Sequence, residues 1–246
     1  GVNDEQAQKN MKFVLVRVKT IINSNVVTGD FTPEHLELLS NTLHQMYINP
    51  MFEQYAEEKE SENPSGTCGK QEPMVLDLTQ GPYAEGFAKY TDRNKITRNP
   101  VAGGYKNKKE VPFQRQLDEN LANFLRTAFL LQYPQYANSF TIFSFVNEGT
   151  GTLRGFCEVA ADVKTMKFSH FKQNVVLFGN RLSTTLSHEA LHGLGLFHTH
   201  FDEKVIGEKE KKYVFIKDTT DNIMSYADSR KTTWYWQWEI VRDKNK

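Results

Sequence analysis

Residues 187–200, SHEALHGLGLFHTH, contain four of the seven histidines of the chain. On a helix over residues 182–194, with about 100° between successive residues, the leucines share one arc and His188 and His192 lie together on the opposite arc. Two imidazoles at positions i and i+4 can both reach one metal ion. Glu189 lies between the two arcs, where its carboxylate can hydrogen-bond a water molecule at that metal.

A catalytic zinc site with histidine ligands needs a third protein ligand. If the helix continued, His198 would lie roughly 9 Å along the axis from His192 and would be rotated away from it. Gly195 can adopt a positive φ and turn the chain sharply. We therefore predict that Gly195 ends the helix and that the turn brings His198 beside His188 and His192.

The spacing is H-E-x-x-H-x-x-G-x-x-H, and DNIMSY places Met224 in a turn-like stretch farther along the chain. This combination resembles the metzincin zinc endopeptidases, whose signature holds these five positions and a methionine turn (Met-turn). The resemblance implies a zinc ion at His188, His192 and His198. It also implies that Met224 forms a floor under the metal. Tyr226 matches a movable extra ligand and oxyanion stabiliser of some branches, although a tyrosine after a turn is often simply packed.

The order of strands and helices along the chain is typical of an α+β or α/β fold with one mixed sheet. The resemblance implies an α+β fold, with a mixed twisted sheet, an active-site helix and a carboxy-terminal helix after the Met-turn. The specific match covers about residues 174–240. Thr199, which follows the third histidine, does not match the usual residue of astacins, matrixins, adamalysins or serralysins, so the branch stays open. The HT-x-F pattern, DNIMSY and WQWEIVR also resemble bacterial metallopeptidase domains at the ends of secreted toxins and secretion-system effectors. A free-standing secreted protease is the main competitor.

The function implied is hydrolysis of peptide bonds in a protein or peptide substrate. Glu189 serves as the general base for a metal-activated water, and Tyr226 stabilises the oxyanion. A zinc amidase that acts on peptidoglycan peptides is an alternative with the same metal chemistry. A non-enzymatic binding module with a protease fold is a third class, but its sign would be the loss of Glu189 or of a ligand, and neither is lost. An inhibitor, an immunity protein or a larger parent chain are the partners that the resemblance suggests.

Composition limits the other classes of function. The 246 residues contain 30 Lys and Arg and 30 Asp and Glu, so no global basic field favours nucleic acid. No apolar run approaches the roughly 20 residues of a membrane span. We expect one metallopeptidase domain over residues 1–246, with an amino-terminal subdomain over 1–195 and a carboxy-terminal subdomain over 196–246. The first residues do not resemble a signal peptide, but the resemblance to toxins leads us to expect a protein secreted or delivered outside the producing cell.

Periodicity predicts the secondary structure around this helix. Strands are expected at 12–21, with Phe13 and Leu15 inward and Val18 as a further inward candidate, and at 74–78, 140–146 and 174–179. Helices are expected at 33–48 and 116–131, and again in the tryptophan-rich segment at the carboxy-terminal end. Loops are expected at 56–73 and over most of 81–112, where their length suggests that they border a site. The strand at 174–179 is our candidate edge for binding an extended substrate, because it leads into the active-site helix.

Other polar residues keep more than one interpretation. His200 is expected to face solvent, with a rival ligand or a group behind the ligands as alternatives. Cys68 and Cys157 form either one disulfide or two free thiols. The basic residues of 89–109 predict a solvated loop, with binding of an acidic substrate or partner as the alternative; they are Lys89, Arg93, Lys95, Arg98, Lys106, Lys108 and Lys109.

Overall fold

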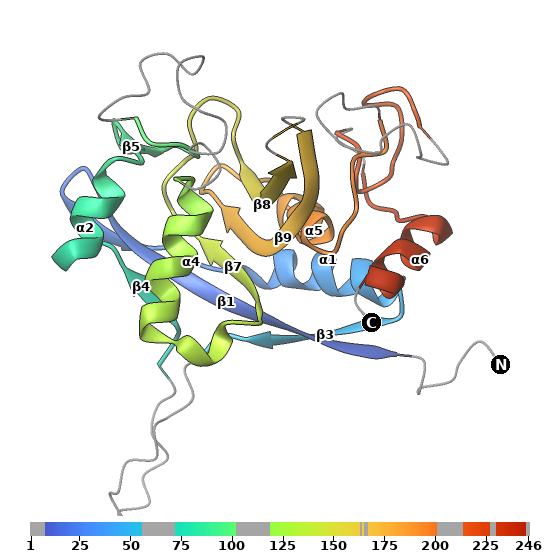
Figure 1. Ribbon diagram of the computed structural model, residues 1–246, viewed down its shortest axis with the longest axis horizontal. Coiled ribbons are helices and arrows are strands. Elements are labelled where there is room, and N and C mark those ends of the chain that lie inside the picture. The colour runs from blue at the N-terminus through green and yellow to red at the C-terminus, as the bar shows by residue number, and fades with distance from the viewer. Residues whose placement is uncertain are drawn as a thin grey trace, which may run out of the picture.

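The computed structural model describes residues 8–55, 72–101, 119–162, 164, 167–200, 214–226 and 230–244. Within them the chain has an α+β fold with one curled, mixed sheet of seven strands (Figure 1). The main strand order is β2-β1-β7-β9-β8, and β3 and β4 also pair with β1. The bounds are β1 Lys9–Ile22, β2 Asn25–Thr28, β3 Ile48–Glu53, β4 Val75–Asp77, β7 Phe140–Ser144, β8 Gly155–Asp162 and β9 Lys167–Leu177.

Helices cover both faces of this sheet. The helices α1 (Pro33–His44) and α5 (Thr185–Gly193) contribute leucines to one buried cluster, and Val241 of α6 (Tyr235–Lys244) joins it. The helices α2 (Gly81–Ala88) and α4 (Leu121–Gln132) contribute to a second cluster on the opposite face. Figure 1 shows α4 in front of the sheet and α1 behind it. The sheet is therefore the middle layer of three.

The long strand β1 shows how the sequence produces these two cores. Successive side chains of a strand point to opposite faces. Phe13 and Leu15 accordingly join the cluster with α1 and α5, whereas Val14, Val16 and Val18 join the cluster with α4. The expected strand is confirmed, but Val18 faces the cluster opposite to that of Phe13 and Leu15 and so does not share their inward face as predicted. The interior of the strand is two-sided, which explains why residues 13–16 are all apolar.

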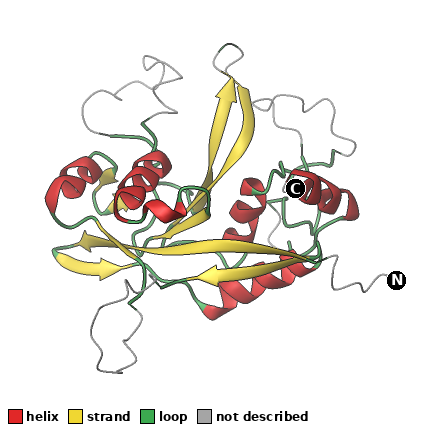
Figure 2. Cartoon of the chain, turned by 60° about the horizontal axis from the view of Figure 1, so that its bottom comes forward, coloured by secondary structure: helices red, strands yellow, loops and turns green. Residues whose placement is uncertain are grey.

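The identity of the edge strand corrects our prediction. The segment 174–177 of β9 pairs with β7 on one side and with residues 155–157 of β8 on the other. It is therefore an interior strand, and 174–179 is not the edge. Among the described residues, β8 pairs with no strand other than β9, so β8 is the edge next to α5. The parts of β8 and β9 beyond β7 extend from the sheet as a hairpin (Figure 2).

The expected loop over most of 81–112 is wrong in part. Residues 81–88 form α2 rather than a loop, because Pro82 occupies the first turn and Phe87 is buried and stacks on Phe145. Farther along the chain, Phe215 forms an isolated bridge with His200. Short strands β5 (Thr91–Asp92) and β6 (Lys95–Ile96) pair with each other, and a 3-10 turn, η2, spans Pro134–Tyr136.

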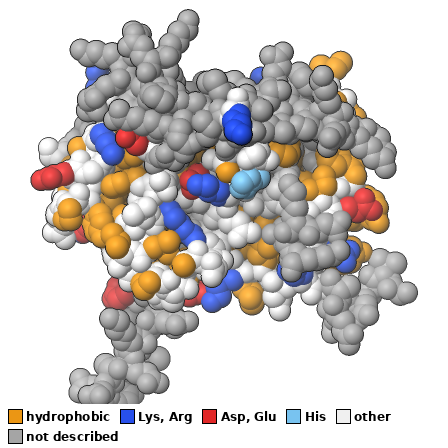
Figure 3. Space-filling view, viewed as in Figure 1, with side chains coloured by type: hydrophobic (Ala, Val, Ile, Leu, Met, Phe, Trp, Pro, Cys, Tyr) orange, Lys and Arg blue, Asp and Glu red, His pale blue; other side chains and the backbone are white. Residues whose placement is uncertain are grey.

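No helix in the described part of the chain is both long and apolar enough to cross a membrane. On the face shown in Figure 3, the described Lys and Arg side chains lie scattered among acidic, apolar and polar ones. The segments 56–71 and 102–118, which hold Cys68, Lys106, Lys108 and Lys109, lie outside the described residues.

Candidate metal centre

The helix α5 ends as the glycine predicted. Gly195 has a φ of +101°, which an L side chain rarely adopts. The backbone N–H of Leu196 donates to the carbonyl of Leu191 at 3.0 Å, and that of Gly195 donates to His192 at 2.8 Å. These two bonds are the Schellman arrangement, which satisfies the last carbonyls of a helix and reverses the chain. The reversal returns His198 to the face of α5 that carries the two helical histidines.

The three predicted histidines meet at one point. The Nε2 atom of His198 lies 3.3 Å from Nε2 of His188 and 3.1 Å from Nε2 of His192. One ligand atom from each of the three residues can be chosen so that all lie within 4.8 Å of one another, an arrangement that could hold a metal ion. His188 and His192 are each 3% exposed, so the helix is buried on its imidazole side as well as on its leucine side.

Backbone carbonyls determine the tautomers of the two helical imidazoles. Nδ1 of His188 lies 2.7 Å from the carbonyl of Ile223, and Nδ1 of His192 lies 2.7 Å from the carbonyl of Leu196. A carbonyl only accepts, so each Nδ1 carries the hydrogen, and in the neutral ring Nε2 then presents a lone pair. Burial also lowers the pKa of His188 well below 6.5, and the neighbouring His192 lowers it further. The ring of His188 is therefore neutral, the form that ligates a metal.

The spacing of the nitrogens fits a small tetrahedral cation. Zinc–nitrogen bonds of about 2.0–2.1 Å in tetrahedral geometry separate the ligand atoms by roughly 3.3 Å. The separations of 3.3 Å and 3.1 Å to His198 agree with this value. One shared cation would satisfy ring nitrogens that face one another at this distance. The donor set of imidazoles suits zinc, and it also suits copper, iron or nickel.

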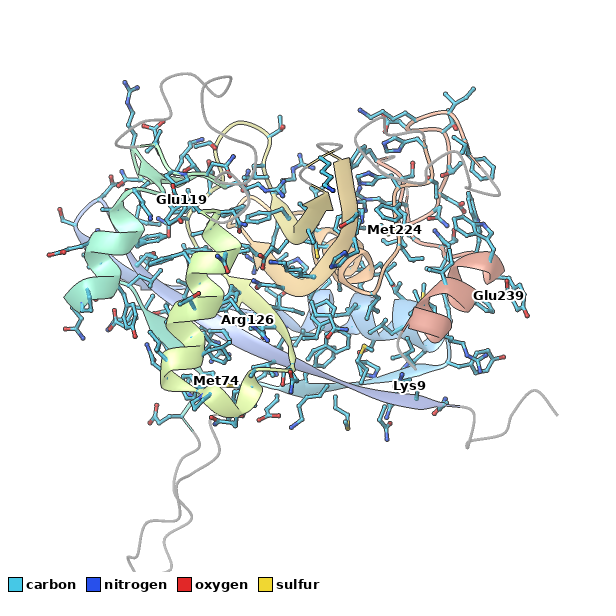
Figure 4. All side chains as sticks on the ribbon, viewed as in Figure 1. Lys9, Met74, Glu119, Arg126, Met224 and Glu239 are labelled. Carbon is cyan, nitrogen blue, oxygen red and sulfur yellow. The ribbon has the colours of Figure 1, made fainter. Side chains whose placement is uncertain are left out.

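The turn around Met224 positions the backbone carbonyl that contacts His188. The side-chain oxygen of Asn222 accepts from the backbone N–H of Met224 at 2.9 Å, which is an Asx-turn. The amide of Asn222 also exchanges two hydrogen bonds with Gln237 of α6, and both residues are fully buried. Met224 is buried in the same cluster as the leucines of α5 and lies between α5 and α6 in Figure 4. The turn thereby presents the carbonyl of Ile223 to His188.

Tyr226, two residues after Met224, contacts the third histidine. Its hydroxyl lies 2.8 Å from Nε2 of His198, and 44% of the residue is exposed. His200 was expected to face solvent, but it is only 8% exposed, and its ring stacks on His198 with centroids 4.8 Å apart. The bridge between His200 and Phe215 holds it there, which the local sequence did not indicate.

Glu189 lies half-buried beside the histidines. Burial raises its pKa from 4.5 to about 7, although Arg98, the backbone N–H of Cys157 and Arg230 all oppose the rise. The strand β8 approaches this carboxylate closely, because a Cβ added to Gly155 would lie 3.3 Å from Cγ of Glu189 and 2.9 Å from a methyl group of Thr185. A glycine at 155 thus lets β8 pack against α5.

A pocket of about 240 Å³ opens between β8, α5 and Tyr226. It is lined by the three histidines, Glu189, residues of β8, Phe171, Phe197 and Arg98. Sequence reasoning assigned Arg98 to a solvated loop, and the structure corrects this, because the side chain is partly buried in the pocket. Cys157 of β8 also lines the pocket as a buried free thiol, and burial raises its pKa well above 9.0. The alternative prediction, a disulfide between Cys157 and Cys68, involves a residue outside the described part of the chain.

Arg230 is a further residue that sequence reasoning missed. It is 8% exposed, and it donates to the carbonyl of Ser225 at 2.8 Å and to the hydroxyl of Thr184 at 3.1 Å. It therefore ties the turn around Met224 to the start of α5. Only the long-range packing reveals this role, since no local pattern surrounds Arg230.

Comparison of the chain with protein-family models, with curated protein sequences and with solved structures gives no match. The functional argument therefore depends on the residues of this chain.

Proposed function

We propose that this protein is a zinc-dependent endopeptidase of the metzincin type. The observation that carries the proposal is the convergence of the Nε2 atoms of His188, His192 and His198, with Nδ1 of each of the two helical rings bonded to a backbone carbonyl. The adjacent half-buried carboxyl of Glu189 and the hydroxyl of Tyr226 supply the other groups that hydrolysis of an amide needs.

A zinc ion bound by these nitrogens would polarise the scissile carbonyl and make a water molecule more acidic. Glu189 removes a proton from the water whose oxygen attacks the carbonyl carbon. It then delivers that proton to the amine nitrogen as the carbon–nitrogen bond breaks. A pKa of about 7 suits a group that must both accept and donate a proton near neutral pH. The Tyr226 hydroxyl donates to the oxyanion of the tetrahedral intermediate.

The edge strand β8 provides the surface for the substrate. It borders the pocket through Gly155, Phe156, Cys157 and Val159. An extended peptide that pairs with a sheet edge gains main-chain hydrogen bonds independent of its side chains. The resemblance to toxin and effector metallopeptidase domains extends the proposal to a protein secreted or delivered outside the producing cell.

The test combines metal analysis with proteolysis. The purified protein, loaded with zinc and then desalted, is assayed for zinc content and for cleavage of casein. We expect about one zinc per chain and turnover, and we expect Glu189→Gln to retain the zinc and lose turnover. Glu239→Gln is the matched control, because Glu239 is exposed on α6, away from the pocket (Figure 4).

The outcomes separate the candidate functions. A protein that takes up no zinc would refute the central claim. A protein that holds zinc but cleaves neither casein nor a peptide library, and instead cleaves peptidoglycan stem peptides, would favour the amidase. Full activity in Glu189→Gln would refute the assigned base.

A further inference from the structure

Arg98 places a positive charge inside the candidate active-site pocket. It follows β6, and its backbone carbonyl accepts from the N–H of Leu121, the first residue of α4, at 2.9 Å. Its guanidinium carbon lies 4.8 Å from the centre of the Phe156 ring of β8. The backbone contact and the aromatic ring hold the side chain on the wall of the pocket. Glu189 and the three histidines line the same pocket.

The guanidinium keeps its donors available. Within the part of the chain that the structure describes, Arg98 makes no side-chain hydrogen bond or ion pair, and its contact with the Phe156 ring occupies no N–H donor through a hydrogen bond. Burial lowers the pKa of Arg98, and the carboxylates of Glu189 and Glu158 oppose this. An arginine nevertheless stays protonated in proteins, so the pocket holds a fixed positive charge with five N–H donors.

The chemistry of this group selects one kind of partner. A guanidinium is a planar fork that matches a carboxylate with two parallel hydrogen bonds. Glu189 is the nearby carboxylate of the protein, but a base that receives a proton in each cycle is not a permanent partner. A peptide lying along β8 would pass both Phe156, on which Arg98 stacks, and the histidines.

We propose that Arg98 is a specificity-determining residue that selects substrates with a carboxylate close to the scissile bond. The inference rests on the proposed function, because it names the substrate class of that same site. Two sources can supply the carboxylate: an aspartate or glutamate side chain next to the cleaved bond, or the carboxy-terminal carboxylate of the substrate.

The test compares isosteric acid and amide substrates. Internally quenched peptides carry Asp or Asn, and Glu or Gln, at each of the two positions on either side of the cleaved bond. A second set has neutral side chains and ends shortly after that bond in either a free carboxylate or an amide. We expect one set to show about a tenfold to hundredfold higher kcat/KM for the acid, the range for a charge-assisted hydrogen bond. The set that shows the preference identifies the source.

Variants of Arg98 assign the preference to this side chain. Arg98→Gln should bring the acid-to-amide ratio close to one, and Arg98→Glu should reverse it in favour of lysine at the same position. Arg154→Gln is the matched control, because Arg154 is exposed and directly precedes β8. This substitution should leave the acid-to-amide ratio unchanged. If Arg98→Gln does not fold, Arg98→Lys keeps the charge without the fork and should retain a smaller preference.

A binding measurement adds a readout without turnover. In the Glu189→Gln background, fluorescence anisotropy should show tighter binding of the preferred acidic peptide than of its amide, and the difference should vanish when Arg98→Gln is added. A wild-type ratio near one, or a ratio unchanged in Arg98→Gln, overturns the inference while peptide cleavage still supports the proposed function. Failure to bind zinc and to cleave any peptide overturns both.

Discussion

Replacement of Glu189 by glutamine should stabilise the metal-free protein while it abolishes turnover. The carboxyl is half-buried between α5 and β8, and burial raises its pKa from 4.5 to about 7. The folded state therefore holds this proton more tightly than the unfolded chain. Below pH 4.5 both states are protonated and Glu189 costs nothing. As the pH rises from 4.5 to about 7, the unfolded chain releases this proton while the folded state keeps it, so stability falls across this window and levels off once the buried group is also ionised.

The size of the effect follows from the two pKa values. A change from 4.5 to about 7 corresponds to about 3 kcal/mol, at about 1.4 kcal/mol for each pKa unit. Solvent screening at a half-buried group reduces the expected gain to about 2 kcal/mol above pH 8. Glutamine has the same shape and keeps an acceptor for the N–H of Cys157, so the substitution removes the charge alone.

The assay is urea unfolding of both proteins in the presence of a chelator, at pH values from 4.5 to 8.5. The difference in the free energy of unfolding should be near zero at pH 4.5 and should grow to about 2 kcal/mol at pH 8, equivalent to roughly 4–8 °C in Tm. Glu239→Gln should show no such pH dependence, because Glu239 is exposed. A Glu189→Gln protein that is no more stable than wild type at pH 8 would refute the claim that the carboxylate is desolvated.

Three other substitutions test the geometry of the site. Tyr226→Phe removes the hydroxyl 2.8 Å from His198, and kcat should fall by about a hundredfold while zinc content and Tm stay unchanged; an unchanged kcat would contradict the role in oxyanion stabilisation. Gly195→Ala forces a side chain into a φ of +101°, so unfolding should become easier by roughly 1–2 kcal/mol and zinc titration should show weaker binding; wild-type zinc affinity would contradict the role of the turn. Asn222→Ala leaves Gln237 without its buried amide partner and should lower the free energy of unfolding in urea by about 2–3 kcal/mol. A loss no larger than that caused by replacing an exposed asparagine with alanine would contradict the argument.

The sequence predicted the centre of the site because its spacing is local. A helix places residues four apart on one face, so His188 and His192 needed no distant contact to be paired. Gly195 marked the end of the helix because few other residues adopt its backbone conformation. The long, periodic elements β1, α1 and α4 were predicted with modest errors at their ends for the same reason.

The position of a strand within a sheet could not be derived from that strand. The stretch 174–177 has four successive buried residues, and such a run is typical of a strand covered on both faces. That signal was present, but the partners β7 and β8 come from segments distant in the chain. The same holds for α2. The glycine and proline at its start predicted a loop, whereas the structure has a positive φ at Gly81 followed by a helix that buries Phe87.

The sequence by itself determined the residues of the candidate metal centre, because local helical geometry and one glycine turn bring three imidazoles and a carboxylate together. Only the tertiary structure decided what surrounds them. It buried His200, made β8 the edge strand and placed Arg98, far away in sequence, on the pocket wall. These contacts depend on long-range packing and hydrogen bonding, which no short stretch of the chain encodes.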